Sequence, residues 1–313
     1  MAKIKIDLIT GFLGAGKTTF IKKYAEYLMK EGEKIGILEN DFGAVNVDMM
    51  LLEDALGEDC GLEMISGGCD RETHRRRFKT KLIAMGMSGY DRVLIEPSGI
   101  FDVDEFFDAL YDEPLDRWYE AGNVIAIVDA RPDGPETEKA RYLLASEAAC
   151  AGCVILSRCE DASETEIQET IARLNEAMEA VSCKRRFQAE VIAKDWNLLT
   201  DQDMERIASC GYVAEDYEKQ TFDEADGFSS LCFLDIPVTK NSLLSAVERI
   251  TGDPACGTIF RVKGFFRADG GWMELNATPQ KAAVTPIKNG QQVLIVIGEK
   301  LDKERIGSCL TEG

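Results

Sequence analysis

The chain is poor in histidine, in basic residues and in long apolar segments. Its single histidine, His74, excludes a histidine-rich metal-storage loop, so a soft-metal site would have to use thiolates and carboxylates. Its 36 Lys and Arg stand against 56 Asp and Glu, which gives a net charge of −20. Because phosphate groups are neutralised by clustered cations, this balance argues against nucleic acid or an anionic membrane as a partner.

No apolar run reaches the length of a membrane span, and the first residues lack the charged-then-apolar pattern of a secretory signal. We therefore expect a cytoplasmic protein. Its ten cysteines should then be reduced thiols, core residues or metal ligands rather than disulfides. The pair Cys150 and Cys153 flanks an apolar strand and has no second pair at zinc spacing, so we expect it to pack in the core.

The most informative segment is GFLGAGKT at residues 11–18, which matches the phosphate-binding pattern G-x-x-x-x-G-K-[ST] at every fixed position. Strand-like alternation over 4–9 precedes it, and helical spacing of apolar residues over 19–29 follows it. This order places backbone N–H groups and a positive helix end around a polyphosphate. Lys17 would reach the β- and γ-phosphates, and Thr18 would ligate Mg²⁺. The residues predicted to bind the phosphates are Gly11, Gly14, Ala15, Gly16, Lys17, Thr18 and Thr19.

Two further strands end in polar residues. The strand over 34–39 is followed by Asn40 and Asp41, where a switch loop would sense the γ-phosphate; an ordinary Asn-Asp turn is the alternative. The strand over 92–96 ends in Glu96, which can hold Mg²⁺ or its water, and the Gly99 N–H can meet the γ-phosphate. We assign catalytic roles to Lys17, Glu96 and Asp41, and nucleotide contacts to Asn40 and Gly99.

Strands alternate with helices up to residue 210, with further strands expected over 124–129, 154–156 and 187–193. This alternation predicts an α/β fold, with the doubly wound, mainly parallel sheet of a P-loop NTPase over residues 1–210. Residues 211–227 carry six acids against one lysine and are predicted to be a linker. A small C-terminal α+β domain is expected over 228–313.

The acidic chain has one basic cluster, formed by Arg75, Arg76 and Arg77 within an expected helix. A solvated helix face is the simplest interpretation of this cluster. A docking site for an acidic partner or an anionic ligand is the alternative.

Four segments together resemble the CobW family of P-loop GTPases: GFLGAGKTT at 11–19, NDFG at 40–43, EPSG at 96–99 and RVKG at 261–264. That family joins a GTPase domain to a small C-terminal domain, so the resemblance covers nearly the whole chain. It implies binding and slow hydrolysis of GTP, with Mg²⁺ and with GDP as product. It also implies a metallochaperone for Zn²⁺ or Co²⁺, or a GTP-driven activator of a client metalloprotein or cobalamin-dependent protein.

The sequence departs from this family at the metal motif. The family's C-x-C-C should lie at residues 66–70, SGGCD, and only Cys69 remains. One thiolate cannot make a tight zinc site, which typically uses four protein ligands. Cys60, Asp70 or His74 could complete a site for Zn²⁺ or Co²⁺, or two protomers of a homodimer could each supply part of it. Otherwise the site is lost or repurposed.

A second departure concerns recognition of the base. The family's N-K-x-D is replaced by Ser157-Arg158-Cys159-Glu160, which Asp161 follows. Glu160 keeps a carboxylate that can accept hydrogen bonds from guanine, and Arg158 can stack on the base, while Ser157 lacks the amide. We expect Ser157, Arg158, Glu160 and Asp161 to meet the base, with GTP preferred over ATP. Two alternatives to a metallochaperone stay open: a nucleotide switch that activates a client without carrying metal, and a small-molecule kinase.

Overall fold

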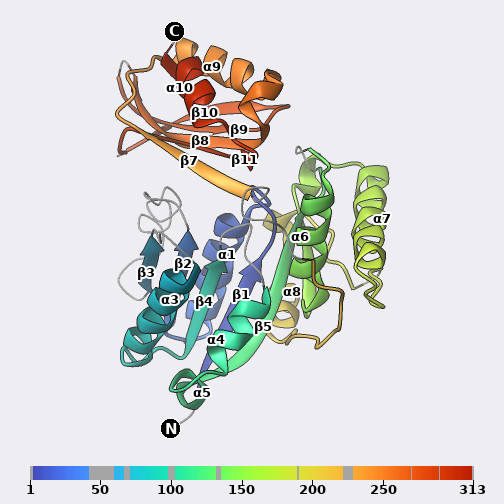
Figure 1. The fold of residues 1–313 in the computed structure, drawn as a ribbon. Helices are drawn as coiled ribbons and strands as arrows, with labels where there is room; N and C mark the ends of the chain where they lie inside the picture. Colours follow the sequence, from blue (N-terminus) through green and yellow to red (C-terminus); the bar gives the residue numbers. More distant parts are fainter. Residues whose placement is uncertain are drawn as a thin grey trace. The chain divides into compact units, whose positions relative to one another are not determined.

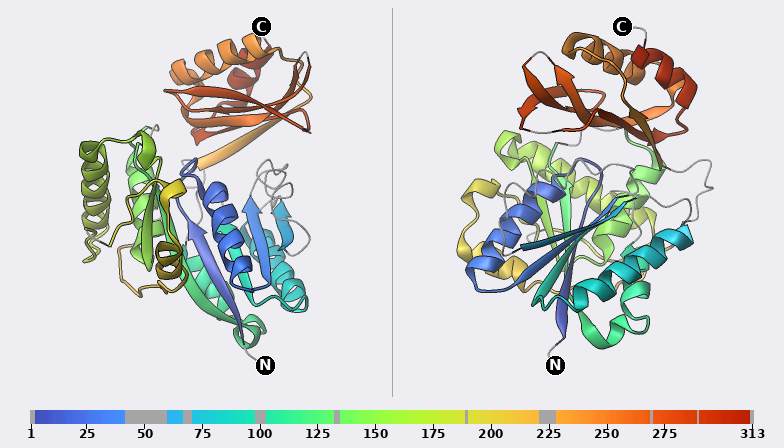
Figure 2. Two further views of the ribbon diagram at one scale, coloured as in Figure 1. Left: turned by 180° about the vertical axis from the view of Figure 1, so that it is seen from behind. Right: turned by 90° about the vertical axis from the view of Figure 1, so that its left-hand side faces the viewer.

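The computed structural model describes residues 3–41, 60–66, 71–97, 103–131, 135–188, 190–220, 228–268, 270–288 and 290–311. The chain divides into two compact units, one built mainly from residues 1–219 and the other mainly from 220–313. Each unit has its own hydrophobic core and its own sheet (Figures 1 and 2). The division falls inside the predicted linker at 211–227; the predicted domain bounds themselves stay a prediction.

The first unit is organised around a six-stranded sheet in which every pair of neighbouring strands is parallel, in the order β3-β2-β4-β1-β5-β6. The predicted doubly wound parallel sheet is therefore confirmed, and its glycine loop follows the strand next to the middle of the sheet. The strands are β1 (Ile4–Thr10), β2 (Ile35–Asp41), β3 (Cys60–Ser66), β4 (Arg92–Pro97), β5 (Tyr119–Asp129) and β6 (Cys153–Ser157).

Helices cover both faces of this sheet (Figures 1 and 2). Helices α1 and α8 lie on one face and close a core of Ile, Leu and aromatic side chains, while α3, α4 and α6 lie on the other face. The helices of this unit are α1 (Lys17–Lys30), α3 (Arg71–Gly86), α4 (Val103–Leu110), α5 (Leu115–Trp118), α6 (Glu138–Ala149), α7 (Glu164–Ala180) and α8 (Asp201–Ala208), with 3₁₀ turns η1 (Cys159–Asp161) and η2 (Trp196–Leu198).

The expected strand over 187–193 is wrong as a regular element. Within its described residues the segment forms one parallel bridge, between Ile192 and Ile155 of β6. At its start, the Phe187 N–H donates to Asn175 Oδ1 (2.7 Å) and the Phe187 carbonyl accepts from Asn175 Nδ2 (3.0 Å). The N–H and the carbonyl of Phe187 are therefore hydrogen-bonded to a side chain of α7 and not to a neighbouring strand.

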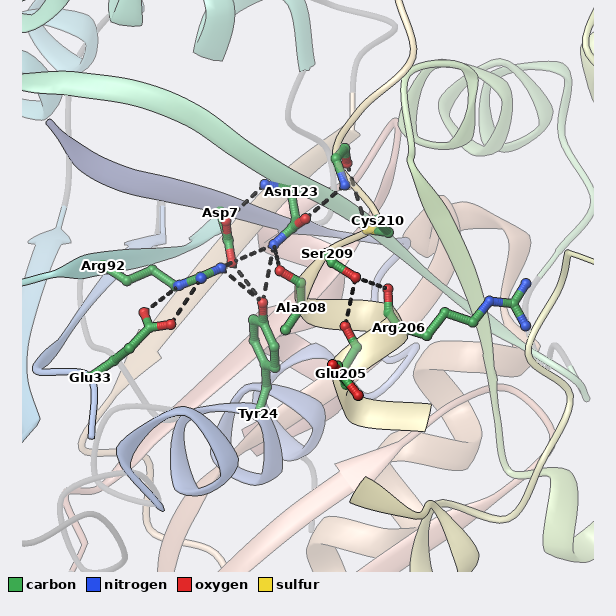
Figure 3. A network of polar contacts seen from close by, with 11 residues as sticks. Asp7, Tyr24, Glu33, Arg92, Asn123, Glu205, Arg206, Ala208, Ser209 and Cys210 are labelled. Carbon is green, nitrogen blue, oxygen red and sulfur yellow. Dashed lines mark hydrogen bonds and ion pairs between the residues drawn. The ribbon is translucent and has the colours of Figure 1, made fainter. Parts of the chain in front are cut away.

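A buried polar network joins the strands to α1 behind the glycine loop (Figure 3). Asp7 of β1 has no exposed surface and accepts from Tyr24 Oη (2.7 Å), from Arg92 Nη1 (2.8 Å) and from both the backbone N and the Nδ2 of Asn123 (2.8 and 3.0 Å). Arg92 also forms a two-pronged ion pair with Glu33 (2.7 and 3.0 Å). The network fixes α1 against β1, β4 and β5. It thereby holds β1 and α1, the two elements that the glycine loop connects, against each other.

The second unit is a five-stranded antiparallel sheet in the order β10-β9-β8-β11-β7. Helices α9 and α10 pack on one face of this sheet and form its core (Figure 1). This α+β architecture agrees with the one expected for the C-terminal part. The elements are β7 (Phe228–Leu234), α9 (Lys240–Gly252), a 3₁₀ turn η4 (Pro254–Cys256), β8 (Thr258–Ala268), β9 (Gly271–Ala277), β10 (Ala282–Ile287), β11 (Val293–Glu299) and α10 (Lys303–Thr311).

The first part of the predicted linker is fastened to the first unit. Tyr212 forms an antiparallel bridge with Ala151, the Val213 N–H donates to the Cys150 carbonyl (3.0 Å) and the Glu218 N–H donates to the Val181 carbonyl (2.8 Å). Among the described helices of both units, none combines the length and the apolar character that crossing a membrane requires.

Candidate functional site

The glycine loop lies between β1 and α1 and uses backbone conformations that glycine allows. Gly11, Gly14 and Gly16 have φ values of +146°, +78° and +98°, in the region that side chains with a Cβ rarely adopt. A Cβ on Gly11 would also collide with the Ile127 carbonyl of β5. The loop can therefore pass close to the end of the sheet and turn directly into α1.

The N-terminus of α1 is left available for an anion. Gly16 caps the helix without a side-chain hydrogen bond, and the first turn carries no acidic residue. The α7 and α8 helices, in contrast, begin with capping boxes at Ser163 and Thr200. Because the first N–H groups of a helix and its dipole both favour negative charge, the α1 terminus suits a phosphate group.

Lys17 folds back over this loop. Its side chain is buried, and its Nζ donates to the Gly11 carbonyl (2.8 Å) and to the Phe12 carbonyl (3.4 Å). The ammonium group is thereby held at the loop rather than in solvent. Phosphate oxygens at the loop would accept from the same group.

Thr18 and Glu96 meet next to the loop, as the sequence predicts for a Mg²⁺ site. The Thr18 Oγ1 donates to Glu96 Oε1 over 2.9 Å, which joins the first turn of α1 to the end of β4. Glu96 is only 6% exposed. A hydroxyl and a carboxylate are hard oxygen ligands of the kind that Mg²⁺ prefers, so these residues fit the ion.

A second buried carboxylate lies on the neighbouring strand. Glu39 of β2 is 2% exposed and pairs in register with Glu96 of β4, so the two side chains point to the same face of the sheet. Sequence reasoning included Glu39 in a strand and gave it no role. The signal that could have revealed it is an acid inside an apolar run, one residue before the polar strand end.

The predicted γ-phosphate sensors are only partly described. Asn40 and Asp41 end β2, with Asn40 in register with Pro97 of β4, so their backbone lies at the carboxyl edge of the sheet. Their side chains, like Gly99 as a whole, lie outside the described residues. Among the predicted phosphate-binding residues, Ala15 is buried and Thr19 is exposed.

The predicted base-binding residues follow β6 and come close to the glycine loop. Arg158 adopts a left-handed conformation (φ +57°), and its Nη2 donates to the Gly14 carbonyl (3.3 Å) while its Nη1 pairs with Asp129 (2.7 Å). Ser157 is buried, and its Oγ has no hydrogen-bond partner among the residues that the structure describes. Glu160 and Asp161 are exposed on η1, where their carboxylates face solvent.

Comparison with known proteins identifies the family. The model of the "CobW/HypB/UreG, nucleotide-binding domain" family matches residues 5–187, which are more than half of the chain and include the glycine loop, Glu96 and the segment that follows β6. The chain belongs to this family. The expected resemblance to CobW proteins is thereby confirmed.

The CobW relatives include two zinc chaperones of Escherichia coli strain K12. YjiA is 30% identical over 185 residues, which are 56% of this chain and 56% of YjiA. YeiR is 29% identical over 170 residues, 54% of this chain and 50% of YeiR. The zinc-regulated GTPase metalloprotein activator 1 of Schizosaccharomyces pombe is 24% identical over 181 residues, 55% of this chain and 44% of that protein. The chain thus spans about half the length of the curated relatives it matches.

A solved CobW-family structure, that of the Zn(II)-bound YjiA GTPase from E. coli, aligns over 100% of this chain and 99% of that chain. Its sequence identity to this chain is 21% and its TM-score is 0.39.

The predicted transition-metal position of this CobW-family chain is not described, because Cys69 and Asp70 lie outside the described residues. Cys60 begins β3, at the opposite end from Ser66 and about 20 Å from it along the strand. Burial raises the pKa of the Cys60 thiol to about 11, which disfavours the thiolate that a metal needs. Within the described part of the chain, no cluster of three or more His, Cys, Asp or Glu side chains is arranged to hold a metal ion.

Two other predictions concern cysteine and arginine. Cys150 and Cys153 are buried, and burial raises the pKa of the Cys153 thiol to about 11, so the expected core packing is confirmed. Arg75, Arg76 and Arg77 are exposed on α3, and Arg75 lies 3.6 Å from Asp112. The exposure of these three arginines agrees with a solvated helix face. The alternative, a docking site for an acidic partner or an anionic ligand, stays a prediction.

Proposed function

We propose that this chain binds GTP with Mg²⁺ and hydrolyses it slowly. The observation that carries the proposal is the contact of Thr18 with Glu96 at the first turn of α1, beside the buried Lys17 ammonium. A glycine loop, an uncapped helix end, a held cation and two hard oxygen ligands make one polyphosphate site.

Each residue of this site has a distinct task in the proposed reaction. Thr18 and Glu96 hold Mg²⁺, directly or through water, and the bound ion neutralises charge on the phosphate oxygens. Lys17 and the loop N–H groups stabilise the charge that develops on the transferred phosphoryl group. Asn40, Asp41 and Gly99 register the γ-phosphate. Such a site works by positioning and electrostatics, and without a strong general base it gives a slow intrinsic rate.

GTP is the proposed nucleotide rather than ATP. Guanine offers a ring N–H and an amino group to one carboxylate, a pattern that adenine lacks. The exposed carboxylates of Glu160 and Asp161 follow the loop that Arg158 ties to Gly14, so they are available to accept from the base. Competition of GTP, ATP and GDP for binding tests this preference.

We further propose that the GTP cycle drives metal delivery to, or activation of, a client metalloprotein in the cytoplasm. The names of the relatives, zinc chaperones and a metalloprotein activator, support zinc as the cargo. Cys69 would contribute one thiolate, with further ligands from the chain or from a second protomer. The second candidate is a switch that activates its client without carrying metal. It is favoured by the single cysteine in the segment SGGCD at residues 66–70.

Replacing Lys17 tests the nucleotide site. We expect Lys17→Ala to lower kcat/KM for GTP by about 10²-fold or more, because one charged phosphate contact is lost, while the far-UV circular dichroism stays unchanged. Lys30→Ala is the matched control, since Lys30 lies at the other end of α1 with a side chain 64% exposed. Retention of GTP turnover in Lys17→Ala would show that the site is assigned wrongly.

An anaerobic titration with Zn²⁺ and Co²⁺ separates the two candidate functions. It compares wild type, Cys69→Ser and the control Cys232→Ser, whose cysteine lies in the second unit, each with and without Mg²⁺–GTP. Stoichiometric binding that responds to GTP and disappears only in Cys69→Ser supports a metallochaperone. Weak metal binding that changes neither with Mg²⁺–GTP nor with the Cys69→Ser substitution supports a switch that activates its client without carrying metal.

A further inference from the structure

The indole of Trp196 lies between the glycine loop and the strand that leads to the base loop. Its Nε1 donates to the Leu156 carbonyl of β6 over 2.8 Å. Its six-membered ring faces Gly16, since a Cβ on that glycine would lie 3.2 Å from the Cη2 atom of the indole. The ring also packs edge-on against Phe20 of α1, with centroids 5.5 Å apart.

These contacts join two parts of the proposed nucleotide site. Gly16 caps α1 and belongs to the phosphate loop, whereas Leu156 directly precedes Ser157, the first predicted base residue. Arg158 forms a second bridge between the same two loops through the Gly14 carbonyl. The end of β6 is therefore held against the phosphate loop at two points. Arg158 makes the contact at Gly14, and Trp196 makes the contact at Gly16.

We propose that Trp196 is a positioning residue that sets the base loop relative to the phosphate loop, so that phosphates and base meet one preorganised site. This inference rests on the proposed function, because it concerns how GTP or GDP is held. The indole does not touch the reacting atoms in this scheme. It acts through the Leu156 backbone and through Gly16, and a preorganised loop spares the bound nucleotide the cost of ordering it.

The hydrogen bond and the ring have separable consequences. Phenylalanine at this position keeps a ring to pack against Gly16 and Phe20 but cannot donate to the Leu156 carbonyl. Trp196→Phe should therefore loosen the base loop and leave the phosphate loop nearly as before. Inorganic pyrophosphate with Mg²⁺ fills the phosphate part alone, and GDP with Mg²⁺ fills both parts.

Calorimetric titration of Trp196→Phe with these two ligands tests the proposal. We expect the Kd of GDP to rise about three- to tenfold, the effect of one lost hydrogen bond, while the Kd of pyrophosphate changes by less than about twofold. In steady-state assays the KM for GTP should rise with kcat nearly unchanged. Trp118→Phe is the control, because Trp118 lies against Gly86 of α3. A Trp196→Phe variant that is less stable but shows the same ratio of the two Kd values overturns the proposal.

Tryptophan fluorescence gives a second measurement that does not depend on replacing Trp196. The chain has three tryptophans, and the third, Trp272, lies against Gly290 in the second unit. In the double variant Trp118→Phe/Trp272→Phe, the emission of Trp196 should change on addition of GDP, because the indole lies between Gly16 and the Leu156 carbonyl that precedes the base loop. An unchanged emission when GDP binds overturns the proposal. If wild type binds neither GDP nor GTP by calorimetry, it is the proposed function that fails.

Discussion

Asp7 is a fully buried carboxylate that depends on its hydrogen-bond donors. It accepts from Tyr24, from Arg92 and twice from Asn123, and it faces the guanidinium of Arg92 at 2.8 Å (Figure 3). Burial and the Asp7 charge raise the pKa of Tyr24 well above its ordinary value of 10.0, so this tyrosine stays a donor. A buried ion pair of this kind adds little net stability, but removing the Asp7 charge leaves Arg92 with Glu33 as its ionic partner and takes a charged acceptor away from the buried Tyr24 and Asn123 donors.

We therefore expect Asp7→Asn to lower the free energy of unfolding by about 3–5 kcal/mol. The measurement is urea denaturation followed by circular dichroism. The matched control is Asp201→Asn, which removes the same charge from a surface pair with Lys30 whose side chains are 78% and 64% exposed. Because both side chains of that pair are exposed to solvent, its loss should cost far less stability than the loss of the buried Asp7 charge. Equal losses in the two variants would show that the network is not a coupled unit.

Glu147 of α6 is a second buried acid, with a different environment. Its side chain is 2% exposed, and its Oε2 has no hydrogen-bond partner among the described residues. Burial raises the pKa of Glu147 from its ordinary value of 4.5 to about 8, and the charge of Lys17 opposes this rise. The carboxyl is therefore protonated in the folded chain at neutral pH, while the unfolded chain releases this proton near pH 4.5.

The sign of the resulting pH dependence follows from proton linkage. Between pH 4.5 and about 8 the folded chain binds one more proton at Glu147 than the unfolded chain, so this residue's contribution to stability falls as the pH rises through that interval. Glu147→Gln removes the titration. We expect the variant to gain stability relative to wild type between pH 5 and pH 8, measured by urea denaturation at several pH values. The matched control is Glu169→Gln, at an exposed position on α7. A pH-independent difference in Glu147→Gln would contradict the prediction.

At the scale of the element, local chemistry made much of the first unit predictable. The glycine loop with Lys17 and Thr18 was found from a fixed spacing, and Glu96 was found from its place at a strand end. The parallel pairing of β1 with β4 then brings Glu96 to Thr18, 78 residues away in the chain. A capping box, Ser163 followed three residues later by Glu166, is a local signal of the same kind for the start of α7, and the structure has both of its hydrogen bonds. Such signals lie within a few residues of one another, so tertiary packing does not alter them.

The elements that were missed depend on their neighbours. The second half of α6 is buried on nearly all sides, which hides the 3.6-residue period of a surface helix. Strand β3 contains a glycine and a glutamate and few β-branched residues, and its parallel pairing with β2 is what makes it a strand. Strand β10 is an edge strand that contains Pro286, a residue that argues against a strand in the sequence.

The same reason explains which site residues escaped prediction. Glu39 lies at the site because β2 and β4 pair in a register that sets it beside Glu96. Trp196 lies at the site because a 3₁₀ turn brings it back to the Leu156 carbonyl, 40 residues earlier in the chain. No short sequence motif encodes the register of β2 with β4 or the approach of Trp196 to Leu156, so the site could be assigned these two residues only from the structure.

At the scale of the whole molecule, each of the two compact units has a hydrophobic core of its own. The core of the first joins α1 and α8 to a parallel sheet, and the core of the second joins α9 and α10 to an antiparallel sheet. The nucleotide site proposed above lies entirely in the first unit. Because a ligand stabilises only the structure that binds it, GDP should raise the stability of the first unit and leave that of the second unit unchanged.

We expect scanning calorimetry of the full chain to show two transitions, of which Mg²⁺–GDP raises one. A ligand at 100 times its Kd adds about 2.7 kcal/mol to the unit that binds it. Ile250→Val, in the core of the second unit, should cost about 1 kcal/mol and lower only the GDP-insensitive transition, by about 4–8 °C for a unit of this size. Ile37→Val makes the same change in the first core and should lower only the GDP-sensitive transition, by about 2–4 °C because that unit is larger. A single transition that moves with GDP and with either substitution would mean that the two cores unfold as one, and the proposed domain division would then be wrong.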